Sequence, residues 1–243
     1  MNTRFAFRAK APARAAAQGK ILVWDAPVRV SHWLMVLSFA GAWLTAESES
    51  WRLVHVTLGY TMAALVGFRL VWGLIGTRPA RFASFVRGPA AVARYLRAAL
   101  SGRPEHHTGH NPAGALAIVA LLLLTALVAA SGWATYSEVG GRSMEDVHEL
   151  LANLMLAVVG LHVAGVLVGS WLHRENLVGA MITGKKAGTP AEGAGKPWRS
   201  VAVVLLAGVL AFWAVQWSAG PAGAGAQSAA GPSSSAHLDR DDD

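Results

Sequence analysis

Apolar residues gather in five long stretches, which are separated by segments rich in charge, glycine or proline. The stretches run approximately over Val30–Ala46, Val54–Ile75, Ala113–Ala134, Leu150–Leu172 and Val201–Trp217. A helix rises about 1.5 Å per residue, so it needs about 20 residues to cross about 30 Å of hydrocarbon. Each stretch is close to that length. The pattern therefore predicts five transmembrane helices.

The composition supports a membrane location. Hydrophobic residues make up 53% of the 243 residues and charged residues only 14%, and the mean hydropathy is +0.39. These values are too apolar for an ordinary soluble domain. The chain contains no cysteine, which excludes a c-type haem bound through C-x-x-C-H, a cysteine-ligated iron–sulfur cluster and any disulfide.

The positions of the basic residues predict the orientation. They concentrate in residues 1–29, between the second and third stretches, and between the fourth and fifth. The opposite side carries only Arg52, Arg142 and Arg240. The positive-inside rule then places the N-terminus in the cytoplasm and the C-terminus in the periplasm of a bacterial inner membrane. With the charges so placed, the net charge of +7 does not indicate nucleic-acid binding.

The chain divides into four expected parts. Residues 1–20 form a basic cytoplasmic extension, 21–186 a four-helix core, 187–219 a linker and fifth transmembrane helix, and 220–243 a disordered acidic tail. The expected fold class is an all-α integral membrane bundle. In the long loop, Pro89–Ala99 sets Arg94 and Arg97 among apolar residues at helical spacing. This pattern fits an interfacial helix and equally fits a partner surface.

Four histidines fall in or at the ends of the apolar stretches: His32, His55, His148 and His162. An ionisable ring in hydrocarbon is costly unless it has a partner or a metal. His148 and His162 are fourteen residues apart, which on a helix is about 21 Å of rise and within about 40° of whole turns. They therefore share one face at two depths. By depth, His162 pairs with His32 near the inner face, and His148 pairs with His55 near the outer face.

Two imidazoles that meet from facing helices supply both axial ligands of a haem iron. Such iron has no open position, so we expect a site that exchanges electrons and does not bind oxygen. A zinc transporter would add carboxylates at the same depth, and no stretch has a central Asp or Glu. Glycines in the stretches allow a flat macrocycle to approach the backbone, and equally allow close helix packing; they are Gly41, Gly59, Gly67, Gly160 and Gly165.

Two arginines are candidates for the propionates of the inner haem. Arg29 lies about one turn before His32, and Arg69 lies fourteen residues after His55, hence on nearly the same helical face. Snorkelling to the interface is the alternative for Arg69. His110 belongs to a cluster, P-E-H-H-T-G-H-N-P, which is either exposed or lines a quinone or propionate site.

Two sequence strings resemble a known family. Val23–Trp33 (V-W-D-A-P-V-R-V-S-H-W) and His148–His162 (H-E-L-L-A-N-L-M-L-A-V-V-G-L-H) resemble the prokaryotic di-haem cytochrome b561 family and the related b-type subunits of nickel–iron hydrogenases. The resemblance covers about Ile21–Lys186. It implies a four-helix core that holds two non-covalent haem b groups on His32, His55, His148 and His162. It also implies electron transfer between membrane quinone and a redox partner.

The sequence leaves three functions open. The first is an electron-transfer subunit that passes electrons between quinone and a periplasmic or membrane partner such as a c-type cytochrome, with a homo-oligomer possible. The second is a stand-alone superoxide:quinone-type oxidoreductase, for which Arg52 and Arg142 are the available outer cations. The third is a non-haem metal transporter or a structural membrane protein. The fifth helix and acidic tail depart from the four-helix pattern and leave the partner open.

Overall fold

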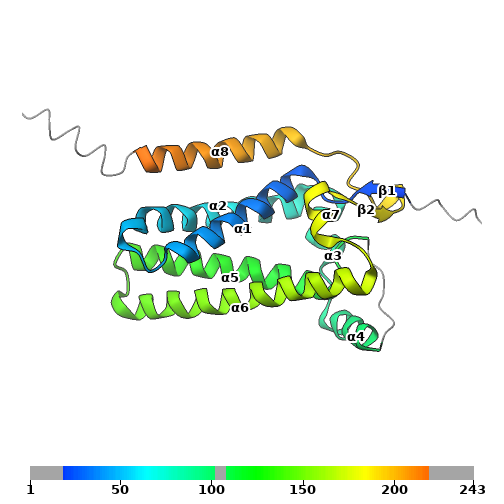
Figure 1. The fold of residues 1–243 in the computed structure, drawn as a ribbon, viewed down its shortest axis with the longest axis horizontal. Helices are drawn as coiled ribbons and strands as arrows, with labels where there is room; N and C mark the ends of the chain where they lie inside the picture. The colour runs from blue at the N-terminus through cyan, green and yellow to red at the C-terminus, as the bar shows by residue number, and fades with distance from the viewer. Residues whose placement is uncertain (1–18, 102–107, 219–243) are drawn as a thin grey trace, which may run out of the picture. The chain divides into compact units, whose positions relative to one another are not determined.

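The computed structural model describes residues 19–101 and 108–218. The expected acidic tail and nearly all of the expected N-terminal extension lie outside these residues, as do His106 and His107. Five long helices occupy the five apolar stretches (Figure 1): α1 (Ala26–Thr45), α2 (Arg52–Ile75), α5 (Pro112–Tyr136), α6 (Gly141–His173) and α8 (Arg199–Ser218). The prediction of an all-α fold with a fifth C-terminal helix is confirmed.

The connections contain shorter elements. The helix expected over Pro89–Ala99 is present as α4 (Pro89–Leu100). The other short elements are η1 (Glu49–Trp51), η2 (Arg78–Ala80), α3 (Phe82–Phe85), α7 (Leu177–Thr183) and η3 (Pro190–Glu192). Two strands that the hydrophobic pattern does not predict, β1 (Gly19–Leu22) and β2 (Lys185–Gly188), pair antiparallel with Leu22 opposite Lys185.

Four of the helical segments in the described part of the chain are long and apolar enough to cross a membrane: Glu49–Ile75, Pro112–Tyr136, Gly141–His173 and Arg199–Ser218. Helix α1 has 20 residues, the length of a span, but it is not among these four. The reason is composition, because Arg29, Ser31 and His32 lie within its first turns and lower its hydropathy.

The residues separate into two compact units. The first, called the sheet unit, comprises the described residues of Met1–Arg29, Leu70–Ala120 and Val158–Trp198. The second, called the α8 unit, comprises the described residues of Val30–Arg69, Leu121–Ala157 and Arg199–Asp243. Helices α1, α2, α5 and α6 each contribute residues to both units.

The sheet unit is built around the segment that links β1 to α1. Val23 and Trp24 are buried and pack with Ala180 of α7. Their backbone N–H groups donate to the Gly184 carbonyl at 2.8 and 3.0 Å. Gly184 ends α7 with φ +81°, and a Cβ there would lie 2.5 Å from the Trp24 carbonyl oxygen. Only glycine satisfies both the left-handed conformation and this close approach.

The α8 unit has an apolar core formed by three helices. Leu34 of α1, Leu65 of α2 and Val209 of α8 are buried together. The Trp213 Nε1–H donates to Thr61 Oγ at 2.8 Å, which adds a polar link between α8 and α2. In this unit the fifth helix therefore covers a flank of α1 and α2.

Candidate haem-binding sites

The α8 unit brings together two of the four predicted histidines, His55 of α2 and His148 of α6. Their ring centroids are 6.2 Å apart and the ring planes are inclined by 82°. Both residues are half-buried. The pairing that sequence depth predicted for the outer side is thus present as a close contact between facing helices.

Hydrogen bonds orient both rings in the same way. His55 Nδ1 lies 2.8 Å from the Ala42 carbonyl oxygen, and His148 Nδ1 lies 3.1 Å from the Val128 carbonyl oxygen. A carbonyl oxygen accepts but cannot donate, so each Nδ1 carries the hydrogen and donates it. The Nε2 atom of each neutral ring is then left with its lone pair, which is the arrangement found in metal-ligating histidines.

Ser131 supports the His148 ring further. Its Oγ lies 3.1 Å from His148 Nδ1 and donates to the Val128 carbonyl at 3.0 Å. The next residue, Gly132, lets the ring lie against α5, because a Cβ there would be 2.9 Å from His148 Cε1. The close approach of α5 to His148 therefore requires glycine at this position.

The glycines of the apolar stretches that the sequence singles out divide into two groups. A Cβ on Gly41 would lie 2.6 Å from Leu58 Cδ1, so this glycine serves the packing of α1 on α2. A Cβ on any of the other four would meet no atom within 4 Å; these are Gly59, Gly67, Gly160 and Gly165. Gly59 lies one turn after His55, which leaves space beside that ring.

The donor set and its surroundings fit a haem. A metal–imidazole bond is about 2 Å long, so rings with centroids 6.2 Å apart are compatible with one metal ion between them. Within the described residues, no group of three or more His, Cys, Asp or Glu side chains is arranged to hold a metal ion. A two-imidazole site in an apolar bundle suits a metal whose other ligands come from a macrocycle.

His32 and His162, the pair predicted for the inner side, belong to different units, and their pairing stays a prediction. Both are half-buried, and the His32 ring packs edge-to-face on Trp33 with centroids 5.3 Å apart. Helix α6 is continuous over Gly141–His173. His148 and His162 therefore lie on a single helix, as the spacing argument requires.

The predicted propionate cations have distinct environments. Arg29 donates from Nη1 to the Ile182 carbonyl at 2.6 Å. Arg69 is only 8% exposed although it lies within a span, and this burial disfavours snorkelling, in which the guanidinium would reach the surface. Arg52, an arginine predicted for the outer side, is exposed. Its Cζ lies 5.9 Å from the centroid of the Tyr136 ring, and its Nη1 lies 3.8 Å from Glu49 Oε2.

His110 lies in the sheet unit between two aromatic rings. Its ring centroid is 4.4 Å from that of Trp24 and 4.5 Å from that of Phe85. It lines a cavity of about 210 Å³ together with Arg78 and Arg87. Of the two alternatives for this histidine, the structure favours a residue that lines a cavity.

Sequence reasoning missed the organising role of Asp25, which is fully buried. Its Oδ1 accepts the Val28 N–H at 2.9 Å and so caps the N-terminus of α1. Its Oδ2 accepts Trp72 Nε1–H at 3.0 Å and Thr77 Oγ–H at 2.6 Å. An acidic residue just before Ala26-Pro27 was a recognisable helix-start signal. The carboxylate fixes the start of the helix on which Arg29 and His32 follow.

Comparison with known proteins agrees with these features. Residues 23–184 match the family model of prokaryotic cytochrome b561. The chain belongs to this family. The match spans the buried Asp25 and all four predicted ligand histidines, and it confirms the family predicted from the two sequence strings.

Relatives of this cytochrome b561 include proteins named as hydrogenase subunits. A probable Ni/Fe-hydrogenase B-type cytochrome subunit of Azotobacter vinelandii is 28% identical, over 69% of this chain and 88% of the relative. Similar subunits from Escherichia coli K12 and Rhizobium leguminosarum bv. viciae are 25% and 22% identical and are covered over 90% and 91% of their lengths. No solved structure matches the chain.

Membership of this family, together with the apolar helices, establishes the general function. The protein is a multi-pass membrane cytochrome of the b type that transfers electrons through haem. A non-haem transporter is therefore excluded.

Proposed function

We propose that this cytochrome b561 carries electrons across the bilayer through two bis-histidine haem b groups. One is held by His55 and His148, and the other by His32 and His162. The observation that carries the proposal is the pair of facing imidazoles, His55 and His148, each anchored through Nδ1 to a backbone carbonyl. When bound, haem b supplies a centre that accepts and releases one electron at a time.

The residues of the proposed outer site orient the two histidine rings and would exclude water and oxygen from the metal. The Nδ1–H bonds to Ala42 and Val128 hold the rings at their tilt and make Nε2 a better donor to a metal. With His55 and His148 both bound to it, the metal would have no position open to water or oxygen. This arrangement favours electron transfer over the superoxide:quinone alternative. Of the two outer cations of that alternative, Arg52 contacts Tyr136 and Glu49, and Arg142 is exposed.

For the inner site we propose His32 and His162 as ligands, with Arg29 and Arg69 as propionate partners. His162 lies about 21 Å along α6 from His148 by helix rise, so two sites on one helix divide the membrane crossing into shorter steps. Arg69 is buried within a span, where an ionisable side chain marks a candidate functional site. Its guanidinium would donate charge-assisted hydrogen bonds to a propionate carboxylate.

The proposed partners in electron exchange rest on the chemistry of the cavity beside His110 and on the names of the relatives. The cavity beside His110 supplies an imidazole and two guanidinium groups to a polar headgroup. Its volume, about 210 Å³, lies below the range of about 300–1,000 Å³ of whole-ligand pockets, so it suits a quinone ring without its tail. The relatives' names favour a redox enzyme as partner. A c-type cytochrome and a homo-oligomer stay as further candidates.

We place the protein in the bacterial inner membrane with the N-terminus in the cytoplasm. The support is the asymmetric distribution of Lys and Arg among the connections. Under this topology the His55–His148 site lies near the periplasmic face, and the cavity beside His110 lies on the cytoplasmic side.

Haem counting tests the proposal. Pyridine haemochrome assays on purified protein should give two haems per chain for the unsubstituted protein and one for His148→Ala. In His148→Ala the remaining haem should keep a low-spin bis-histidine spectrum, and His162→Ala should lose the other haem. His173→Ala, on the same helix, is the matched control and should keep both haems. One haem in the unsubstituted protein, or equal loss of both haems in His148→Ala, would refute two independent sites.

A further inference from the structure

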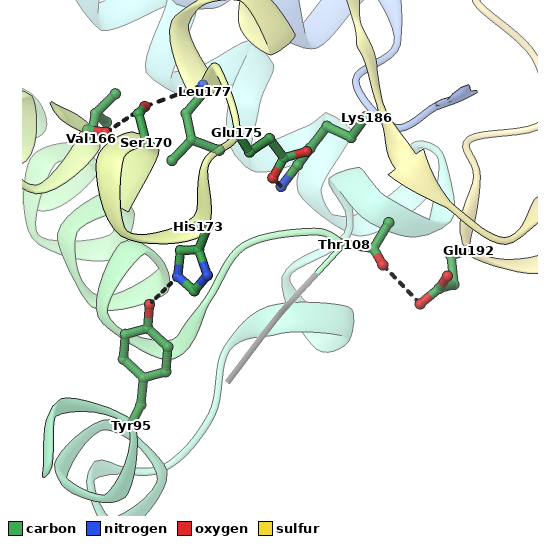
Figure 2. A network of polar contacts seen from close by, with 9 residues as sticks. All are labelled: Tyr95, Thr108, Val166, Ser170, His173, Glu175, Leu177, Lys186 and Glu192. Carbon is green, nitrogen blue, oxygen red and sulfur yellow. Dashed lines mark hydrogen bonds and ion pairs between the residues drawn. The ribbon is translucent and has the colours of Figure 1, made fainter. Parts of the chain in front are cut away.

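Helix α4 presents two different faces. The Tyr95 side chain is 5% exposed, and its hydroxyl lies 3.4 Å from Nε2 of His173 at the end of α6 (Figure 2). Arg94 and Arg97 are exposed, and Leu96 is 47% exposed. At 3.6 residues per turn, Arg97 lies opposite Tyr95, and Arg94 and Leu96 flank it. One face of α4 therefore contacts α6 within the sheet unit, and the other faces outward.

The connections of α4 place it at a membrane surface. It lies between Ile75, where α2 ends, and Pro112, where α5 begins. Both neighbours are long and apolar enough to span a membrane, so residues 76–111 leave and re-enter the bilayer on one side. A 12-residue helix in this connection, held to the end of α6 by Tyr95, lies at the level of the lipid headgroups.

The charge of this connection is strongly one-sided. Residues 76–111 contain six arginines and one acidic residue, Glu105. Val86, shortly before α4 begins, is 45% exposed. The outward surface thus combines aliphatic side chains with arginines. This combination matches the surface of a lipid bilayer, where negatively charged headgroups lie over apolar acyl chains.

We propose that the surface formed by Val86, Arg94, Leu96 and Arg97 binds anionic phospholipid. Leu96 and Val86 enter the outer part of the acyl region, and the two guanidinium groups contact the lipid phosphates. Arginine suits this contact because its planar group donates two parallel hydrogen bonds to one phosphate. The proposal depends on membrane insertion alone and not on haem ligation.

A single spin label tests this surface. The chain has no cysteine, so Leu96→Cys gives one labelling site in the full-length haem-loaded protein. The labelled protein is placed in vesicles of phosphatidylcholine with or without phosphatidylglycerol. Power-saturation EPR then compares the access of oxygen, which concentrates in hydrocarbon, with that of a water-soluble nickel chelate. Ala191→Cys, at an exposed position of η3, is the control label.

We expect the label at position 96 to be more accessible to oxygen than to the chelate in vesicles that contain phosphatidylglycerol. The label at position 191 should be more accessible to the chelate in both kinds of vesicle. Each arginine near an anionic surface changes the equilibrium by about fivefold, so Arg94→Gln/Arg97→Gln should weaken lipid contact by roughly twenty-fivefold. Arg142→Gln, in the first turn of α6, should have no effect.

Three results would overturn the proposal. The first is equal chelate access at position 96 in both kinds of vesicle. The second is an oxygen accessibility at position 96 that stays unchanged in Arg94→Gln/Arg97→Gln. The third is a label that is inaccessible to both reagents in detergent, because protein would then cover this face. Haem content is measured in the same samples, so failure of this surface is distinguishable from failure of the haem proposal.

Discussion

Substituting Asp25 by Asn tests whether this carboxylate organises the start of α1. The change keeps the size of the side chain but replaces one acceptor oxygen by an NH2 group. If the amide oxygen faces Trp72 and Thr77, the NH2 group meets the Val28 N–H and the helix cap is lost. If the amide turns over, the NH2 group meets the Trp72 Nε1–H. In either orientation a buried donor loses its acceptor.

The cost follows from the bonds that are lost. A helix cap contributes about 1 kcal/mol, and a buried donor left without a partner costs about 1–3 kcal/mol. Because Asp25 is fully buried, water does not replace these bonds. Only one of these losses occurs in each orientation of the amide, so we expect Asp25→Asn to lower the free energy of unfolding by about 1–3 kcal/mol. For a chain of this size, this corresponds to a melting temperature lowered by about 2–12 °C.

A thermal melt followed by Soret absorbance measures this shift. The haem proposed for His32 should be lost before the haem proposed for His148, because His32 lies on α1 two turns beyond Asp25. Thr77→Val removes one of the donors to Asp25, so its effect and that of Asp25→Asn should be less than additive in the double variant. A melting temperature unchanged in Asp25→Asn, or strict additivity in the double variant, would refute the role assigned to Asp25.

Two further substitutions probe the α8 unit. Gly132→Ala places a Cβ 2.9 Å from the His148 ring, and overpacking of this kind costs about 1–3 kcal/mol, so the haem proposed for His55 and His148 should bind roughly tenfold more weakly. Haem titration measures this, and Gly208→Ala, where a Cβ meets no atom within 4 Å, should leave binding unchanged. Trp213→Phe removes the donor to Thr61 and should cost about 0.5–1.5 kcal/mol of stability. Spectra of that variant should still show both of the proposed haems, and loss of either one would contradict a purely packing role for α8.

The sequence alone determined the long helices and the spacing of the histidines along them. The stretch expected over Val201–Trp217 is the helix Arg199–Ser218, and the other four agree within a few residues at most of their ends. The largest difference is the start of α6, expected at Leu150 and found at Gly141. This success has a physical reason, because in lipid each helix must satisfy its own backbone hydrogen bonds and cover its length with apolar side chains. Both requirements are local in sequence.

Tertiary structure decided what depends on residues far apart in the chain. The carbonyls that orient His55 and His148 come from residues 13 and 20 positions away, and the donors to Asp25 lie 47 and 52 positions away. Strand β1 finds its partner only after α6 has ended. No local hydrophobic pattern encodes such contacts, because they form only when helices pack and bring buried polar groups within bonding distance.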